Sequence, residues 1–168
     1  KVIYASSAAN DGVKGIPTNI YGWSKLLAEQ YGLALDFDFI ALRYFNVYGP
    51  GEERKGKMAS VGYQAYRAGT FQLFPKKPKR DFVYIKDIVS ATIIIPGVYE
   101  VGSGEARLFE EVLENFEIEY TYRAESEIPD WYQYYTQSDK KNWLPGWEPK
   151  YNLEFGIKDY KEWLKWKY

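Results

Sequence analysis

The stretch Asn19-Ile20-Tyr21-Gly22-Trp23-Ser24-Lys25-Leu26-Leu27-Ala28-Glu29 contains the only Y-x-x-x-K pattern in the 168 residues of this chain. Side chains four residues apart lie on one face of a helix, so Tyr21 and Lys25 are expected to lie close together. A nearby cation favours the phenolate form of a tyrosine, and a phenolate can act as a base. The pattern therefore predicts a catalytic pair of the dehydrogenase type. Because the chain has 17 Tyr, the spacing alone also fits a packed core tyrosine, and the flanking sequence decides between the two.

The flanking segments predict an α/β protein. Residues 2–7 form a predicted buried strand that ends at Ser7, and the carboxyl ends of parallel strands face the crevice in which open α/β sheets bind ligands. Further strands are predicted at residues 39–44, 82–85, 97–101 and 117–122, and helices at residues 21–35, 58–68, 87–95, 109–115 and 153–166. This alternation favours an α/β fold. In the last helix, Phe155, Tyr160, Trp163, Leu164 and Trp166 recur at roughly helical spacing and are expected to pack in the core.

Further motifs follow in a fixed order. They are L-R-Y-F-N-V-Y-G-P at residues 42–50, K-G-K-M-A-S-V at 55–61, R-D-F-V-Y-I-K-D at 80–87, V-G-S-G-E-A-R at 101–107 and W-Y-Q-Y-Y-T-Q-S-D at 131–139. Together with a strand-end Ser before Y-x-x-x-K, they resemble the extended branch of the short-chain dehydrogenase/reductase superfamily, which acts on nucleotide sugars. The K-G-x-M-A-S-V segment is similar to that of the ADP-L-glycero-D-manno-heptose 6-epimerases. The resemblance covers nearly the whole chain.

The resemblance implies a Rossmann-like, doubly wound parallel sheet with a smaller C-terminal α/β substrate domain. Residues 1–50 would belong to the dinucleotide-binding domain, and residues 51–168 mainly to the substrate domain, with residues of about 80–95 returning to the first. No G-x-G-x-x-G follows a strand, although this turn holds the dinucleotide pyrophosphate in the fold. Connections near Asn10, at Ile95-Pro96-Gly97 and after Arg107 are also shorter than those of the family. We therefore expect that the N-terminal part of the Rossmann domain is missing and that the sequence is part of a longer polypeptide.

The resemblance also implies roles for individual residues. The implied catalytic residues are Ser7, Tyr21, Lys25 and Lys55, and those in contact with the cofactor are Tyr21, Lys25, Val47 and Lys55. Substrate contacts are implied for Ser7, Asn46, Lys57, Gln64, Phe74, Arg80 and Tyr132. In this scheme Ser7 hydrogen-bonds the reacting oxygen, Lys55 is a second acid/base residue, and Arg80 pairs with the diphosphate. Each residue also has a structural alternative, since Ser7 can cap a strand end and Lys55 can be solvated surface.

The implied function is inversion of C6 of ADP-D-glycero-D-manno-heptose by transient oxidation with a tightly bound nicotinamide cofactor, in the synthesis of lipopolysaccharide inner-core precursors. NADP would be the cofactor, with NAD as the alternative, and the heptose epimerases are homo-oligomers. Gly51, Lys57 and Gln64 depart from the Arg, Ser and His that the family commonly has, which leaves the sugar open. The alternatives are a UDP-hexose 4-epimerase, a dTDP-glucose 4,6-dehydratase and a non-catalytic nucleotide-binding module. A dehydratase would want a carboxylate directly after Ser7, where the chain has Ala8.

Composition excludes several kinds of site and partner. The chain has no Cys and no His, so disulfides, thiolate or imidazole metal sites and histidine bases are excluded. The net charge of -1 at pH 7 argues against a nucleic-acid binder. Residues 91–95 are mostly apolar but are too few to span a bilayer. We therefore predict a cytoplasmic protein that holds no metal and binds no nucleic acid, and the resemblance implies that its ligand is a small-molecule nucleotide sugar.

Overall fold

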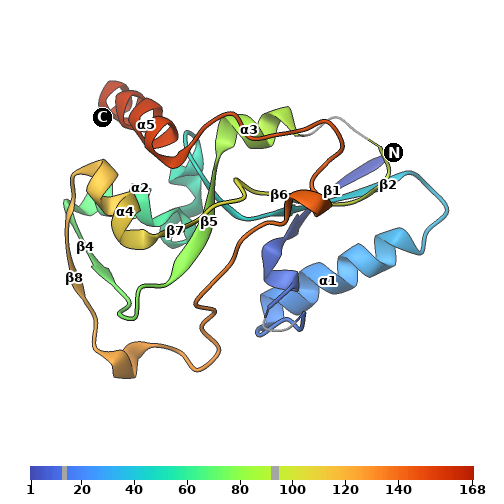
Figure 1. Cartoon of the computed structure of the whole chain (residues 1–168), viewed down its shortest axis with the longest axis horizontal. Helices are drawn as coiled ribbons and strands as arrows, with labels where there is room; N and C mark the ends of the chain where they lie inside the picture. Colours follow the sequence, from blue (N-terminus) through green and yellow to red (C-terminus); the bar gives the residue numbers. More distant parts are fainter. Residues whose placement is uncertain (13–14, 92–94) are drawn as a thin grey trace.

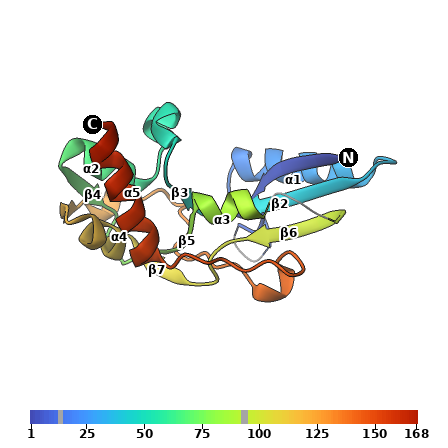
Figure 2. The same ribbon diagram turned by 90° about the horizontal axis from the view of Figure 1, so that it is seen from above.

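The computed structural model describes residues 1–12, 15–91 and 95–168, and it has two groups of elements side by side (Figures 1 and 2). In the first group, β1 (Val2–Ser7), β2 (Phe39–Tyr44) and β6 (Gly97–Val101) form a parallel sheet in the order β1-β2-β6. Helix α1 (Ile20–Leu33) connects β1 to β2 and packs against both strands (Figure 2). A parallel strand–helix–strand unit is the building block of Rossmann-like folds, so the predicted α/β class with a parallel sheet is confirmed.

The second group contains shorter strands and most of the helices. β3 (Asn46–Tyr48) pairs in parallel with β5 (Lys79–Tyr84), which pairs antiparallel with β7 (Ala106–Leu108), and β4 (Thr70–Leu73) pairs in parallel with β8 (Glu119–Tyr122). Helices α2 (Val61–Ala68), α4 (Phe109–Phe116) and α5 (Leu153–Lys167) belong to this group, and α3 (Ile85–Ser90) directly follows β5 (Figure 1). The described residues also form the 3₁₀ segments η1 (Ala8–Asn10), η2 (Glu52–Met58), η3 (Glu125–Glu127) and η4 (Lys140–Asn142). None of the helices in these ranges is both long and apolar enough to cross a membrane.

Strand β5 joins the two groups, because its side chains pack in two separate hydrophobic clusters. Phe82 and Tyr84 belong to a cluster with buried residues of α2, α4 and α5. Val83 belongs to a second cluster with Ile40 and Leu42 of β2. Successive side chains of a strand point to opposite faces, so one strand can serve both cores. The domain boundary at residue 50 remains a prediction from the sequence.

Several predicted elements have different bounds in the structure. Helix α3 begins at Ile85 and ends at Ser90, whereas the prediction was residues 87–95, of which 92–94 lie outside the described residues. Strand β5 begins at Lys79 rather than at residue 82, and β3, β4 and β7 have no counterpart among the predicted strands. These unpredicted strands have three or four residues, too few for a periodicity to be recognised.

The predicted apolar face of α5 is partly wrong. Tyr160 and Leu164 are fully buried, but Phe155 is 58% exposed and Trp166 is 83% exposed. The buried face is completed by Ile157, which lies three residues before Tyr160. A helix turns by about 100° per residue, so the positions 157, 160 and 164 share one face while 155 and 166 fall outside it.

Candidate active site

The predicted catalytic pair lies at the start of α1, next to the end of β1. Asn19 caps the helix by accepting a hydrogen bond from the backbone N–H of Gly22 at 2.9 Å, which starts the helix one residue before Tyr21. Lys25 Nζ donates a hydrogen bond of 2.9 Å to the carbonyl oxygen of Ala5 in β1. The same ammonium lies 5.7 Å from the centre of the Tyr21 ring. Tyr21 is 55% exposed, so it is not a packed core tyrosine.

Ser7 ends β1 and begins η1. Its hydroxyl oxygen accepts a hydrogen bond of 3.2 Å from the backbone N–H of Ala9, as expected of a strand-end cap. Ser7 also lines the same cavity as Tyr21 and Lys25. The capping bond uses one lone pair and leaves the hydroxyl proton free for a ligand oxygen. The two interpretations of Ser7 are therefore compatible.

One cavity of about 530 Å³ brings together six of the predicted site residues. They are Ser7, Tyr21, Lys25, Asn46, Val47 and Lys55. Tyr44 and Phe45, at the carboxyl end of β2, also line it, so the cavity lies where the parallel strands β1 and β2 end. This is the edge at which open α/β sheets bind ligands.

Lys55 reaches the cavity from η2, a segment separate from α1. Gly51 and Gly56 have φ angles of 94° and 54°, in the left-handed region that favours glycine, and they allow the segment to turn sharply at both sides of Lys55. Within the described residues, no hydrogen bond or ion pair involves the Lys55 ammonium. It is therefore available to a ligand.

Two predicted substrate residues lie away from this cavity. Neither Lys57 nor Gln64 lines it. The Gln64 side chain instead donates hydrogen bonds to the carbonyl oxygens of Ala59, at 2.7 Å, and Lys57, at 3.3 Å. In this structure Gln64 supports the backbone that follows Lys55, next to Ala59 of the cavity lining, and its contact with substrate stays a prediction.

A second, smaller cavity of about 180 Å³ contains Phe74 and Tyr132, whose rings are 5.0 Å apart in an edge-to-face arrangement. Val61 and Phe109 line both cavities, so the two are neighbours. Arg80 lines neither cavity, but its guanidinium lies 5.1 Å from the Tyr132 ring and 5.8 Å from the Phe109 ring. The structure thus groups Phe74, Tyr132 and Arg80 beside the main cavity.

Arg80 carries a buried charge without a carboxylate partner. It is 9% exposed, donates to the backbone carbonyls of Lys79, at 2.9 Å, and Gln133, and forms no ion pair in the part of the chain that is described. Burial lowers the pKa of Arg80, because the charged form loses hydration. A guanidinium has five N–H donors, and two are used here. An anion next to Arg80 would therefore find a charge and free donors.

A buried polar network joins α1 to β1 and β2, and it was not predicted from the sequence. Glu29, one turn after Lys25, is fully buried and accepts hydrogen bonds from Arg43 of β2 at 2.5 and 3.0 Å. The same carboxylate accepts from Ser6 at 2.8 Å and from Asn10 at 3.1 Å. The Glu29 hydrogen bond holds the pKa of Arg43 above its usual range. A single Arg in the apolar run F-I-A-L-R-Y was the available signal, since a buried charge needs a partner.

Asp81 is a second buried carboxylate that was not predicted. It is fully buried beside Arg80 and accepts hydrogen bonds from the backbone N–H and hydroxyl of Ser103, at 2.6 and 2.7 Å, and from the N–H of Gly104 at 3.0 Å. It also accepts from the N–H and hydroxyl of Ser138, at 2.9 and 2.7 Å. Asp81 therefore fixes the turn after β6 and the segment near residue 138 against β5.

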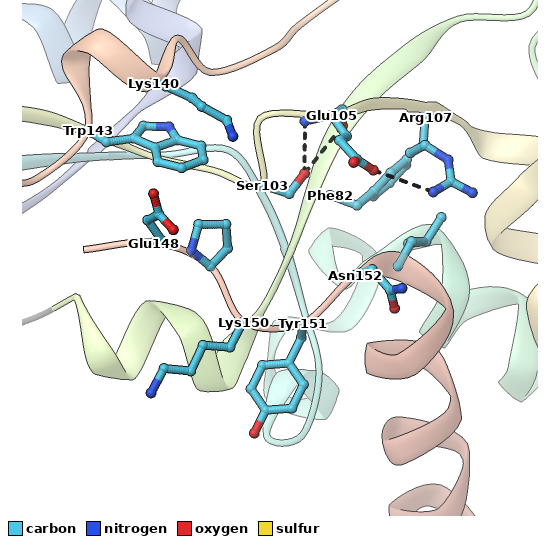
Figure 3. A pocket seen from close by; sticks show the side chains of 12 residues that line it. Phe82, Ser103, Glu105, Arg107, Lys140, Trp143, Glu148, Lys150, Tyr151 and Asn152 are labelled. Carbon is cyan, nitrogen blue, oxygen red and sulfur yellow. Dashed lines mark hydrogen bonds and ion pairs between the residues drawn. The ribbon is translucent and has the colours of Figure 1, made fainter. Parts of the chain in front are cut away.

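A third cavity, of about 290 Å³, is shown in Figure 3 and contains none of the predicted site residues. Arg107 of this cavity lies 3.7 Å from Glu105 (Figure 3). Its guanidinium is also paired with Glu111 at 2.5 Å and with Glu154. These contacts tie β7 to α4 and α5. Lys140, Glu148 and Lys150 also line this cavity, but it contains no Tyr–Lys pair of the kind that Tyr21 and Lys25 form in the first one.

No group of three His, Cys, Asp or Glu in residues 1–12, 15–91 and 95–168 could hold a metal ion. The chemistry that the site offers is proton transfer by Tyr21 and Lys55 and charge pairing by Lys25 and Arg80. Tyr21 and Lys25 come from the same helix, α1, whereas Lys55 comes from η2 and Arg80 from β5.

Comparisons with known proteins identify the family to which this chain belongs. The family model for the NAD dependent epimerase/dehydratase family matches residues 2–105. A curated relative from Pseudomonas aeruginosa, an ADP-L-glycero-D-manno-heptose-6-epimerase, is 39% identical over 140 residues, which are 66% of this chain and 42% of the relative. The chain thus spans less than half the length of this relative.

Solved structures show the same fold. The ADP-L-glycero-D-manno-heptose-6-epimerase of Helicobacter pylori matches with a TM-score of 0.82 and 34% identity, covering 98% of this chain and 60% of that one. MoeE5 in complex with UDP-glucose and NAD has a TM-score of 0.80 at 22% identity, covering 99% of this chain and 65% of that one. From the extent of the family match, this chain belongs to the NAD dependent epimerase/dehydratase family.

Proposed function

We propose that the protein is a nucleotide-sugar epimerase that inverts C6 of ADP-D-glycero-D-manno-heptose, a step in the synthesis of lipopolysaccharide inner-core precursors. The observation that carries the proposal is the single cavity that contains Tyr21 with Lys25 from one segment and Lys55 from another. The similarity to heptose epimerases from two bacteria supports the choice of substrate.

The cavity fits the nicotinamide end of a dinucleotide. Val47 gives it an apolar wall, and Lys25, held by the carbonyl of Ala5, is a fixed donor for ribose hydroxyls. A bound nicotinamide supplies the hydride acceptor and donor that a transient oxidation requires. We propose NADP, with NAD as the alternative. The chain has no Gly-rich turn for the pyrophosphate, so the described residues account for one end of the cofactor only.

In the first half-reaction, Tyr21 accepts the proton of the C6 hydroxyl. The Lys25 ammonium lies 5.7 Å from the centre of the Tyr21 ring, and Ser7 donates a hydrogen bond to the reacting oxygen. When the C6 hydride also leaves, to the nicotinamide that would be bound in the cavity, the product would be a ketone at C6. Inversion requires reduction of this ketone from its other face, so its oxygen must meet a second proton donor. Lys55 supplies that proton, because its ammonium has no other partner in the described chain.

The rest of the substrate is held by groups outside the reacting centre. Asn46 lines the main cavity and hydrogen-bonds the sugar. Arg80 binds the diphosphate with the donors that its two backbone contacts leave free. Phe74 and Tyr132 line the neighbouring apolar cavity and pack on the nucleotide. The assembly into homo-oligomers and the cytoplasmic location remain predictions.

Turnover of ADP-D-glycero-D-manno-heptose and of UDP-glucose by the wild type and by Lys55→Met tests the proposal. The variant should bind the heptose nucleotide but lose roughly 10²- to 10⁴-fold in epimerisation, the usual contribution of a general acid/base. Arg54→Met is the matched control. It removes a cation from the same segment, and Arg54 does not line the cavity. Wild-type rates for Lys55→Met would exclude the two-base mechanism. Activity on UDP-glucose alone would identify a 4-epimerase instead.

A further inference from the structure

The segment that carries Lys55 is closed by one buried carboxylate. Glu52 is 2% exposed, although it lies only three residues from Lys55 in a charged stretch. Its carboxylate accepts hydrogen bonds from the backbone N–H of Ser60 at 2.6 Å, from the Ser60 hydroxyl at 2.7 Å and from the N–H of Gly49 at 3.4 Å. Glu52 therefore joins the two ends of the loop that runs from residue 49 to 60.

The C-terminal helix α5 holds the same loop from the outside. The buried Tyr160 of α5 lies beside Glu52, and burial, with the charge of Glu52 as the next cause, raises the pKa of the Tyr160 phenol far above its usual range. At the surface, Lys167 of α5 forms an ion pair with Glu53. The loop is thus anchored at an inner point by Glu52 and at an outer point by Glu53.

A buried carboxylate is costly, and here it is not offset by a cation. Within the described residues Glu52 forms no ion pair, and its hydrogen-bond donors are neutral. Loss of hydration disfavours such a charge, so a Glu at this position costs stability unless the loop requires it. The loop does require a restraint, because Gly51 and Gly56 flank Lys55 and glycines lose much backbone entropy on ordering.

The Glu52 bonds also bear on the cavity directly. Ser60 lines the cavity and caps α2, accepting the backbone N–H of Tyr63 at 3.2 Å. The carboxylate thus ties the Lys55 loop to the start of a rigid helix that forms the cavity wall. An acid/base group must be held within hydrogen-bond reach of its proton, and small displacements reduce its effect strongly.

We propose that Glu52 is a positioning residue that fixes the Lys55 ammonium at the cavity by clamping the loop between Gly49 and Ser60. The inference rests on the proposed role of Lys55 as the second acid/base group. Glu52 does not touch the substrate, since it does not line the cavity. It acts on the reaction through Lys55 alone.

A double-mutant cycle of Glu52→Gln and Lys55→Met tests this, using the polypeptide that the gene encodes with its cofactor bound. Glutamine keeps the size of the side chain but replaces one acceptor oxygen by a donor, which opposes the N–H groups of Gly49 and Ser60. Glu52→Gln should lower kcat for heptose epimerisation roughly 10- to 100-fold with little change in KM, and the double variant should be no slower than Lys55→Met. Glu162→Gln, the same change at an exposed position of α5 away from the loop, should stay within about twofold of the wild type.

Hydrogen exchange gives a readout besides activity. In Glu52→Gln the amide of Ser60 should exchange at least tenfold faster, while the amides of α5 keep their wild-type rates. If Glu52→Gln fails to fold, Ser60→Ala removes one of the three hydrogen bonds and should show the same non-additivity with Lys55→Met at a smaller loss, about three- to tenfold. Losses that multiply in the double variant, or a wild-type kcat for Glu52→Gln, would overturn the inference. Wild-type activity of Lys55→Met would instead overturn the proposed function on which it rests.

Discussion

Replacing Glu29 by Gln should destabilise the protein by about 3 kcal/mol, because the Arg43 guanidinium loses the buried one of its two carboxylate partners. Glu29 is fully buried and accepts four hydrogen bonds, two of them from Arg43. Breaking a buried ion pair on one side costs about 3–5 kcal/mol. Arg43 has a side chain that is 20% exposed and keeps its contact with Asp11, so partial hydration places the cost at the lower end.

Urea unfolding measures this cost. With an m value of about 1–3 kcal/mol/M, a loss of 3 kcal/mol lowers the midpoint by about 1–3 M. Glu162→Gln, at an exposed position of α5, is the matched control and should change stability by less than about 0.5 kcal/mol. Replacing both Glu29 and Arg43 by Leu should restore much of the loss, since the unpaired charge disappears. A midpoint for Glu29→Gln equal to that of the control would refute the view that this network secures α1 to β2.

Three further changes test other parts of the structure. Arg80→Lys keeps the charge but loses the guanidinium fork, so calorimetry should find ADP bound roughly 10- to 100-fold more weakly; unchanged affinity would exclude Arg80 from diphosphate binding. Asp159→Asn removes the ion pair with Lys86, whose hydrogen bond lowers the pKa of Asp159. Since that pKa lies below the unfolded value, the contribution is present above about pH 4 and lost as pH falls through the folded value. The variant should be less stable by under about 1 kcal/mol at pH 7, where the pair is partly screened, and this difference should shrink in unfolding curves at pH 3. Gly32→Ala places a methyl 2.2 Å from the ring of Phe39, so thermal unfolding should show a loss of about 1–3 kcal/mol; a wild-type midpoint would contradict this packing.

The larger elements were predictable because their patterns are long. The strand at residues 2–7 has its predicted bounds, and α1 differs from the prediction by one or two residues at each end. Strands β3, β4 and β7 were not predictable, because a strand of three or four residues is stabilised by its neighbours and not by its own sequence. In α5, the prediction placed Phe155 and Trp166 on the apolar face because they are large aromatic residues. The smaller side chain of Ile157 is buried instead. Size is a poor guide to burial when a helix has aromatic residues on several sides.

The candidate site also contains some residues that could be predicted from the sequence and others that could not. Residues within motifs, such as Tyr21, Lys25 and Lys55, could be named from the sequence because the proposed chemistry would require those side chains. Glu29 and Glu52 could not, because sequence reasoning places charged side chains at the surface unless a partner is known. Most of their partners lie 8–23 residues away and meet them only in the folded chain, while Gly49 lies three residues from Glu52. The residues that hold a site in place thus carry a weaker signal than those that react.

The departures at Lys57 and Gln64 bear less on the sugar than the sequence suggested. Both lie outside the cavity that contains Tyr21 and Lys55, and the Gln64 amide is used to hold the backbone at Ala59. A neutral His at position 64 could donate only one such hydrogen bond and its charge would change near neutral pH, whereas the amide keeps both donors at every pH. Gln64 therefore suits the support of the Lys55 loop. Under the proposed function, we expect discrimination between sugars to depend on side chains that do line the cavity, among them Asn46.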